Sequence, residues 1–84
     1  MGIIKATYIN YKFDTGSWAR VVANWCDVVG VDFIAESIGA DPGTIRAWSR
    51  GTFKEGYQYP SMTLFMRACN ALDLNPQTFF VLDE

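Results

Sequence analysis

Residues 34–51 decide the fold, and they read IAESIGADPGTIRAWSRG. This stretch predicts two short helices joined by a sharp turn. Gly39 can adopt the left-handed conformation that ends the first helix. Asp41 is a good N-cap residue and Pro42 suits the first helical position, so the second helix should begin there. Gly51 should end it.

The second helix, residues 42–50, should have one packed side and one open side. Ala35 in the first helix lets the two helices approach closely, while Ile45 and Trp48 anchor the second helix to the core. The side that remains is free to enter a DNA major groove. It carries Gly43, Thr44, Arg46, Ala47 and Arg50.

Helical periodicity extends upstream of this pair. From Ser17 onward, apolar residues recur at helical spacing and predict a helix over residues 17–29. Its inward side holds Trp18, Val21, Val22, Trp25 and Val29. Gly30 should break this helix, and residues 31–38 should form the next one, with Ile34, Ala35 and Ile38 inward.

Two further helices are expected downstream. Pro60-Ser61 begins a helix over residues 61–72, with Met62, Phe65, Cys69 and Leu72 inward. Asn75-Pro76 repeats the signal of an N-cap followed by proline, which predicts a short fifth helix over residues 76–82. The resulting fold class is mainly all-α, with residues 15–84 as one helical domain.

Residues 3–13, which read IIKATYINYKF, have a different pattern. They are rich in β-branched and aromatic residues and predict a strand within an N-terminal arm, residues 1–14. One face of this strand carries Ile3, Thr7, Ile9, Tyr11 and Phe13. The sequence offers no convincing second strand, and an isolated strand is not stable, so we expect residues 3–13 to pair antiparallel with a second copy. The alternative is a homodimer formed by the segment from Phe79 to Leu82.

Charge is unevenly distributed along the chain. The formal net charge is −2, which alone argues mildly against a nucleic-acid partner. The segment from Pro42 to Lys54, however, contains Arg46, Arg50 and Lys54 and no acidic residue. Because local potential matters more than the sum, this segment is a candidate electropositive surface. A chance cluster on a solvated face is the alternative.

Composition restricts the remaining function classes. The chain has 84 residues, of which 50% are hydrophobic, so it can form one domain with a core. It has no apolar run of about 18 residues and no secretory signal pattern, so we expect a soluble cytoplasmic protein.

Cys26 and Cys69 are not in a CxxC pair and are expected to be reduced thiols on separate helices rather than a disulfide. There is no histidine, which excludes Cys/His zinc sites and histidine-based catalytic triads. We therefore expect no enzymatic activity, metal, cofactor or small-molecule ligand.

Over roughly residues 17–82, the chain resembles the lambda-repressor-like family, the Cro/C1 or XRE type of helix-turn-helix. The resemblance lies in Ile34-Ala35-Glu36, Gly39, Thr44-Ile45, Trp48 and Arg50-Gly51, and downstream in Pro60-Ser61, Phe65, Ala71-Leu72 and Asn75-Pro76. It implies a five-helix domain that binds double-stranded DNA sequence-specifically, as small Cro-type repressors do, and that acts as a homodimer on a palindromic operator.

The resemblance also implies roles for individual residues. Arg46 would contact guanine, with Gly43 and Ala47 close to the bases, while Arg50 would hold phosphate. Thr44 and the amides at Val31 and Asp32 would face the DNA backbone. Lys54, Tyr57 and Tyr59 could touch the backbone or lie in a plain solvent-exposed loop.

The sequence departs from the family pattern in three ways. Pro42-Gly43 stands where many relatives have Gln or Ser, and Gly30 stands where Ser or Thr is usual. The loop 52–59 is longer than the typical short connection. Two other interpretations stay open. One is a helix-turn-helix fold used to bind protein, as an anti-repressor or antitoxin partner does, which the acidic net charge supports. The other is an ordinary helical bundle.

Overall fold

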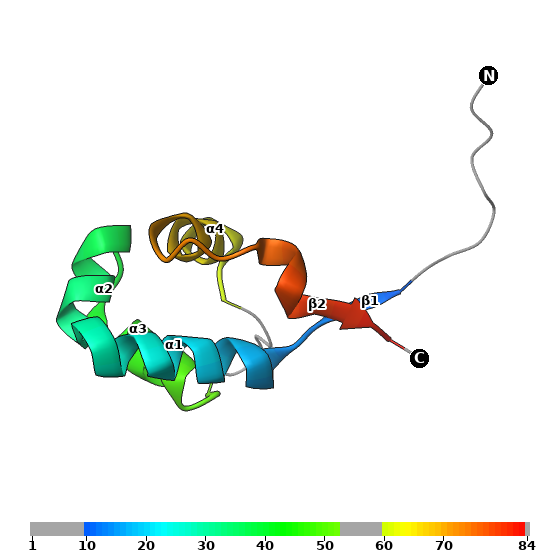
Figure 1. The fold of residues 1–84 in the computed structure, drawn as a ribbon, viewed down its shortest axis with the longest axis horizontal. Helices are drawn as coiled ribbons and strands as arrows, with labels where there is room; N and C mark the ends of the chain where they lie inside the picture. The colour runs from blue at the N-terminus through cyan, green and yellow to red at the C-terminus, as the bar shows by residue number, and fades with distance from the viewer. Residues whose placement is uncertain (1–9, 53–59, 84) are drawn as a thin grey trace, which may run out of the picture.

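The computed structural model describes residues 10–52 and 60–83 of the chain. Within them lie four α-helices, one 3₁₀ turn and a two-stranded antiparallel sheet (Figure 1). The helices are α1 (Thr15–Val29), α2 (Val31–Ile38), α3 (Pro42–Ser49) and α4 (Met62–Ala71); the turn is η1 (Pro76–Phe79); the strands are β1 (Tyr11–Phe13) and β2 (Phe80–Leu82). The helix α1 runs between α2 at one end of the molecule and the β1–β2 sheet at the other (Figure 1).

Local signals at both ends account for the length of α1. The Asp14 carboxylate accepts hydrogen bonds from the backbone N–H of Ser17 at 3.1 Å and from the Ser17 hydroxyl at 2.6 Å, so Asp14 is the N-cap. The helix ends at Gly30, whose φ of 90° and ψ of 152° are accessible essentially to glycine alone. The sequence placed the start two residues later, at Ser17.

Aromatic side chains dominate the core. Trp18 is fully buried, and its ring centroid lies 4.9 Å from that of Phe65, 5.0 Å from that of Phe79 and 5.4 Å from that of Trp48. These spacings are typical of favourable aromatic pairs. Because these rings come from α1, α3, α4 and η1, this cluster fixes the positions of four elements relative to one another.

The predicted fifth helix is wrong over its second half. Asn75 caps a helical turn that begins at Pro76, as expected, but this turn is 3₁₀ and ends at Phe79. Phe80, with φ −114° and ψ 119°, is already extended, and the chain continues as β2. The aromatic and β-branched residues of this segment favour a strand once a partner strand is present.

That partner is β1, which corrects a second expectation. The register is antiparallel and pairs Tyr11 with Leu82, Lys12 with Val81 and Phe13 with Phe80. The chain therefore supplies its own second strand to residues 11–13, and Phe13 is buried in the core of its own domain. Of the residues assigned to an intermolecular strand, Ile3, Thr7 and Ile9 lie outside the described part of the chain.

Most other predictions about helix faces are confirmed. In α2 the three buried residues are those expected, and in α4 Phe65 and Cys69 are buried. Met62 is an exception: it was expected to point inward but is 64% exposed at the first position of α4. No helix among the described residues is long and apolar enough to span a lipid bilayer.

Candidate nucleic-acid interface

The turn between α2 and α3 is tight and braced by α4. Gly39 has a φ of 70° and a ψ of 36°, the left-handed conformation expected from the sequence. The next backbone N–H, of Ala40, donates to the carbonyl of Ala35 at 2.9 Å. From α4, the Arg67 guanidinium donates to the carbonyl of Ile38 at 3.3 Å. The α2–α3 pair is therefore fixed at its turn by backbone and side-chain bonds.

The beginning of α3 explains why glycine occupies position 43. The Asp41 carboxylate caps the helix by accepting from the backbone N–H of Gly43 at 2.9 Å. A Cβ atom at position 43 would lie only 2.7 Å from the Asp41 carboxylate oxygen, which is closer than real Cβ contacts. A side chain at position 43 would therefore require the Asp41 carboxylate, which caps α3, to shift.

The helix α3 has two contrasting faces. Ile45 is fully buried and Trp48 is 3% exposed, so this side anchors the helix to the core. The opposite stripe follows the i, i+3, i+7 spacing of one helix face. It contains the exposed residues Gly43, Arg46 and Arg50, flanked by the half-buried Thr44 and Ala47. The structure therefore brings together all five residues that the sequence nominated, four on α3 and Arg50 as its C-cap.

The side chains of Arg46 and Arg50 differ from those of the other described arginines in their hydrogen bonding. Arg20 donates to the Ser17 hydroxyl at 3.4 Å and Arg67 to a backbone carbonyl. Arg46 and Arg50 make no side-chain hydrogen bond to any described residue. Four residues apart on one helix face, the two guanidinium groups present ten donors, enough for bidentate contacts to base edges or phosphates.

The C-terminal end of α3 is closed by the residues that follow it. The backbone N–H and the hydroxyl of Thr52 both reach the carbonyl of Ala47, at 2.9 and 3.2 Å. This arrangement satisfies a carbonyl that the end of a helix leaves unpaired. The remaining candidate backbone contacts, Lys54, Tyr57 and Tyr59, lie outside the described residues.

The beginning of α2 was nominated for its backbone amides. Gly30 is the N-cap and offers no side chain to the first amides of α2, so these remain available to an anion. Val31 is half-buried and Asp32 exposed. The carboxylates of Asp32 and Glu36, both exposed on α2, oppose a close approach of phosphate. The positive character of this face therefore rests on α3.

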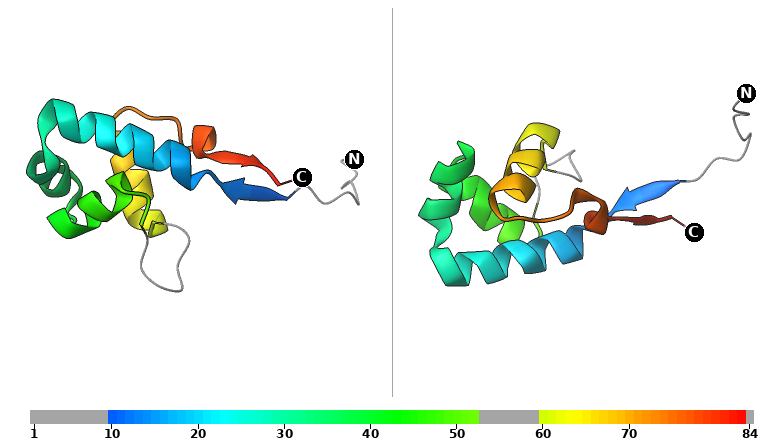
Figure 2. Two further views of the ribbon diagram at one scale, coloured as in Figure 1. Left: turned by 90° about the horizontal axis from the view of Figure 1, so that it is seen from below. Right: turned by 45° about the horizontal axis from the view of Figure 1, so that its top comes forward.

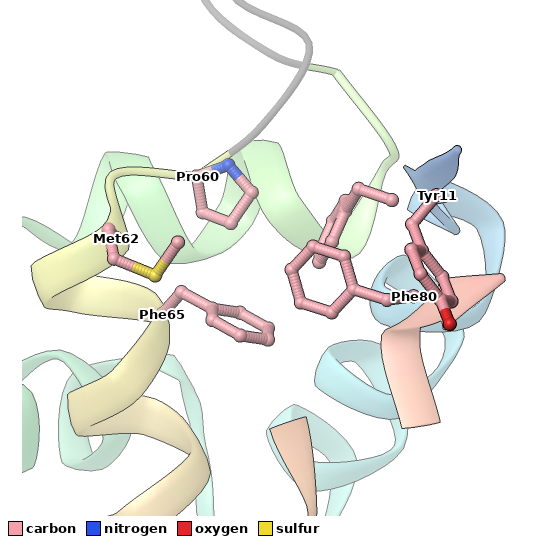
Figure 3. Close-up of a pocket in the computed structure, with 6 residues that line it drawn as sticks. Tyr11, Pro60, Met62, Phe65 and Phe80 are labelled. Carbon is pink, nitrogen blue, oxygen red and sulfur yellow. The ribbon is translucent and has the colours of Figure 1, made fainter. Parts of the chain in front are cut away.

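The sequence did not reveal an apolar groove at the other end of the molecule. The groove has a volume of about 290 Å³ and lies between the β1–β2 sheet and the beginning of α4 (Figure 3). It is lined by Tyr11, Phe13, Pro60, Met62, Phe65 and Phe80. The aromatic and β-branched residues Phe80 and Val81 were the available signal for a strand here, but the preceding Asn75-Pro76 favoured a helix.

The described residues contain no group of three or more histidine, cysteine, aspartate or glutamate side chains that could hold a metal ion. Both cysteines are free thiols, Cys26 on α1 and Cys69 on α4, as the sequence suggested. Burial raises the pKa of both thiols, with Asp27 adding to the effect on Cys26, so both are poor nucleophiles.

Comparison of the chain with protein-family models, curated proteins and solved structures finds no match.

Proposed function

We propose that the protein binds double-stranded DNA and regulates transcription, with α3 inserted in the major groove. The observation that carries the proposal is the exposed face of α3. Two arginines whose side chains make no hydrogen bond to any described residue stand there, on a helix whose opposite side is anchored by two buried residues, Ile45 and Trp48. A rigidly held helix with a free basic face is what major-groove recognition requires.

The two arginines have different tasks in this proposal. Arg46 lies near the middle of the exposed stripe, beside Ala47, where a side chain can reach a base edge; it would read a guanine through O6 and N7. Arg50, at the end of α3, would hold a phosphate and so fix the register without reading sequence. Thr44 and the first amides of α2 would add further contacts to the DNA backbone.

One recognition helix reads few base pairs, so a homodimer on a palindromic operator is part of the proposal. The protein would then act as a Cro-type repressor that occupies its operator and blocks polymerase. Its activity would follow its own concentration, because we assign no inducer site to it.

A second candidate function is protein binding through the same fold. The observation that favours it is the acidic surface around the beginning of α2, where Asp27, Asp32 and Glu36 are all exposed. Such a surface suits a basic protein partner better than DNA.

A salt titration separates the two functions. Binding of the protein to a labelled duplex of mixed sequence would be measured by fluorescence anisotropy at several salt concentrations. DNA binding predicts that log K falls linearly with log salt, with a slope of about −0.9 per phosphate contacted. The double variant Arg46→Ala/Arg50→Ala should flatten the slope, whereas Arg20→Ala, a matched change on α1, should leave it unchanged. A wild-type protein without measurable duplex affinity at low salt would refute the proposal and favour the protein-binding function.

A further inference from the structure

The exposed stripe along α3 offers side-chain hydrogen-bond donors but no side-chain acceptors. It consists of Gly43, Arg46 and the C-cap residue Arg50, on a helix that lies at the edge of the helical body (Figure 2). A guanidinium group carries five N–H donors and no acceptor. In the major groove guanine presents two acceptors side by side, whereas adenine and cytosine each present an amino group. The stripe is therefore suited to guanine, and none of its side chains can accept from an amino group.

Polar side chains near the stripe are engaged in the ends of α3. The Asp41 carboxylate accepts from the backbone N–H of Gly43 at 2.9 Å. The Ser49 hydroxyl donates to the carbonyl of Arg46 at 2.8 Å, and the Thr52 hydroxyl donates to the carbonyl of Ala47 at 3.2 Å. A second base beside the guanine would therefore have to be read without a hydrogen bond from these side chains.

The surface next to Arg46 is small and apolar. Gly43 and Ala47 are four residues apart, so they lie one above the other on the same side of Arg46. Gly43 is exposed and has no side chain, while the half-buried Ala47 contributes one methyl group. A Cβ atom at position 43 would lie 2.7 Å from the Asp41 carboxylate, so this space stays open as long as the cap is in place. We call these two residues the Gly43–Ala47 patch.

The spacing along α3 brings the Gly43–Ala47 patch within reach of a neighbouring base pair. An α-helix rises about 1.5 Å per residue, so along the helix axis Gly43 lies about 4.5 Å before Arg46 and Ala47 about 1.5 Å after it. Successive bases of one strand are about 3.4 Å apart. The C5-methyl group of thymine is the apolar group that a base presents in the major groove, and alanine is one of its usual contacts.

We propose that α3 reads a guanine together with an adjacent thymine, whose methyl group packs on the Gly43–Ala47 patch. This inference rests on the proposed function and names the bases that α3 would read. Arg46 supplies the hydrogen bonds to the guanine. The patch removes the thymine methyl group from water, which favours thymine over a pyrimidine that lacks this methyl group.

Removal of a single methyl group from the DNA tests the proposal. A duplex selected by the protein from a random pool should contain a thymine next to a guanine. Replacement of that thymine by deoxyuridine in one half-site keeps all hydrogen-bonding groups and removes only the methyl group. The affinity, measured by fluorescence anisotropy, should fall about three- to five-fold, as expected for one buried methyl group. With cytosine at the same position binding should also weaken, and 5-methylcytosine should be bound about three- to five-fold more tightly than cytosine.

A protein variant assigns the methyl contact to the patch. Ala47→Gly removes the Cβ atom on which the methyl group packs, so this variant should lose most of the preference for thymine over uracil and keep the preference for guanine. Ala23→Gly, the same change at a half-buried alanine on α1, should leave both preferences unchanged. Thermal unfolding verifies that each variant is folded; if Ala47→Gly unfolds, the wild-type measurements decide.

Two results overturn this inference and leave the proposed function standing. One is equal affinity of the wild type for the thymine and uracil duplexes while guanine is still preferred. The other is a folded Ala47→Gly variant whose preference for thymine is undiminished. A selection that enriches no duplex would instead refute DNA binding, and this inference with it.

Discussion

Arg46 and Arg50 stand one helical turn apart, yet their substitutions should have separable effects on DNA binding. Arg46→Ala should cost about 1–3 kcal/mol of binding free energy and relax the preference at one base position, because a bidentate base contact is lost. Arg50→Ala should weaken binding to all sequences alike and reduce the magnitude of the salt slope by about 1. Affinities for an operator and its single-base variants measure both effects. Equal discrimination by Arg46→Ala and the wild type would show that Arg46 does not read a base.

Asp41 combines two opposing effects at the beginning of α3. Its carboxylate caps the helix, so Asp41→Ala should lower the free energy of unfolding by about 0.5–2 kcal/mol. Asp41→Asn retains an acceptor oxygen but removes a negative charge from the end of α3 that is proposed to approach DNA. We expect this variant to be nearly as stable as the wild type and to bind duplex DNA more tightly at low salt. Chemical denaturation and anisotropy measure the two quantities, and weaker DNA binding by Asp41→Asn would place Asp41 away from the phosphates.

At the scale of elements, the turn between α2 and α3 depends on the backbone conformation of Gly39. Gly39→Ala should destabilise the protein by about 1–2 kcal/mol, because a side chain disfavours the left-handed region. Gly16 on α1 is the matched control: a Cβ there would make only an ordinary contact, 3.6 Å from the Asp14 carboxylate. Gly16→Ala should therefore stabilise the protein by about 0.4–1 kcal/mol. Equal effects at the two positions, measured by denaturant unfolding, would contradict this distinction.

The beginning of α1 should respond to acid. Hydrogen bonds from the Ser17 side chain, and then from its backbone, lower the pKa of Asp14 below its usual value of 3.8, and Arg20 adds to the effect. A lowered folded-state pKa means that the stabilisation is present above the unfolded-state pKa and is lost as pH falls through the folded-state value. The melting temperature should fall below about pH 4, and Asp14→Asn should show a smaller fall. Identical pH profiles for the two proteins would show that Asp14 is not responsible.

The bounds of some helices could be predicted from the sequence, and the bounds of others could not. The bounds of α2 and the beginning of α3 were predicted correctly because their signals are local: Gly30, Gly39 and the Asp41-Pro42 pair act on adjacent backbone. The end of the chain was misassigned because Asn75-Pro76 begins a helical turn whether or not a helix continues. What stops it is pairing with β1 at the other end of the chain, and no local pattern contains that information.

The candidate interface was predictable to a similar extent. Once Ile45 and Trp48 are assigned to the core, helical geometry places Arg46 and Arg50 outside. The steric reason for Gly43 was not predictable, because it depends on where the Asp41 carboxylate lies. The support of the α2–α3 turn by Arg67 was missed as well, since it joins residues 29 positions apart in the sequence.

For the whole molecule, the proposed homodimer should bind a palindromic operator more tightly than an isolated half-site, because the second α3 would bind at a high effective concentration. Dimerisation should not alter which bases are read. Affinities for the two duplexes, measured by anisotropy, test this expectation, and equal affinities would contradict the proposed dimer.

An NMR titration can show whether α3 is the element that contacts DNA, as proposed. A duplex selected by the protein from a random pool would be added to ¹⁵N-labelled protein at low salt, and the backbone amide shifts followed. We expect the largest changes at the first residues of α2 and at Gly43, Thr44, Arg46, Ala47 and Arg50. Failure of the selection to enrich any duplex, or shift changes that leave α3 unaffected, would contradict it.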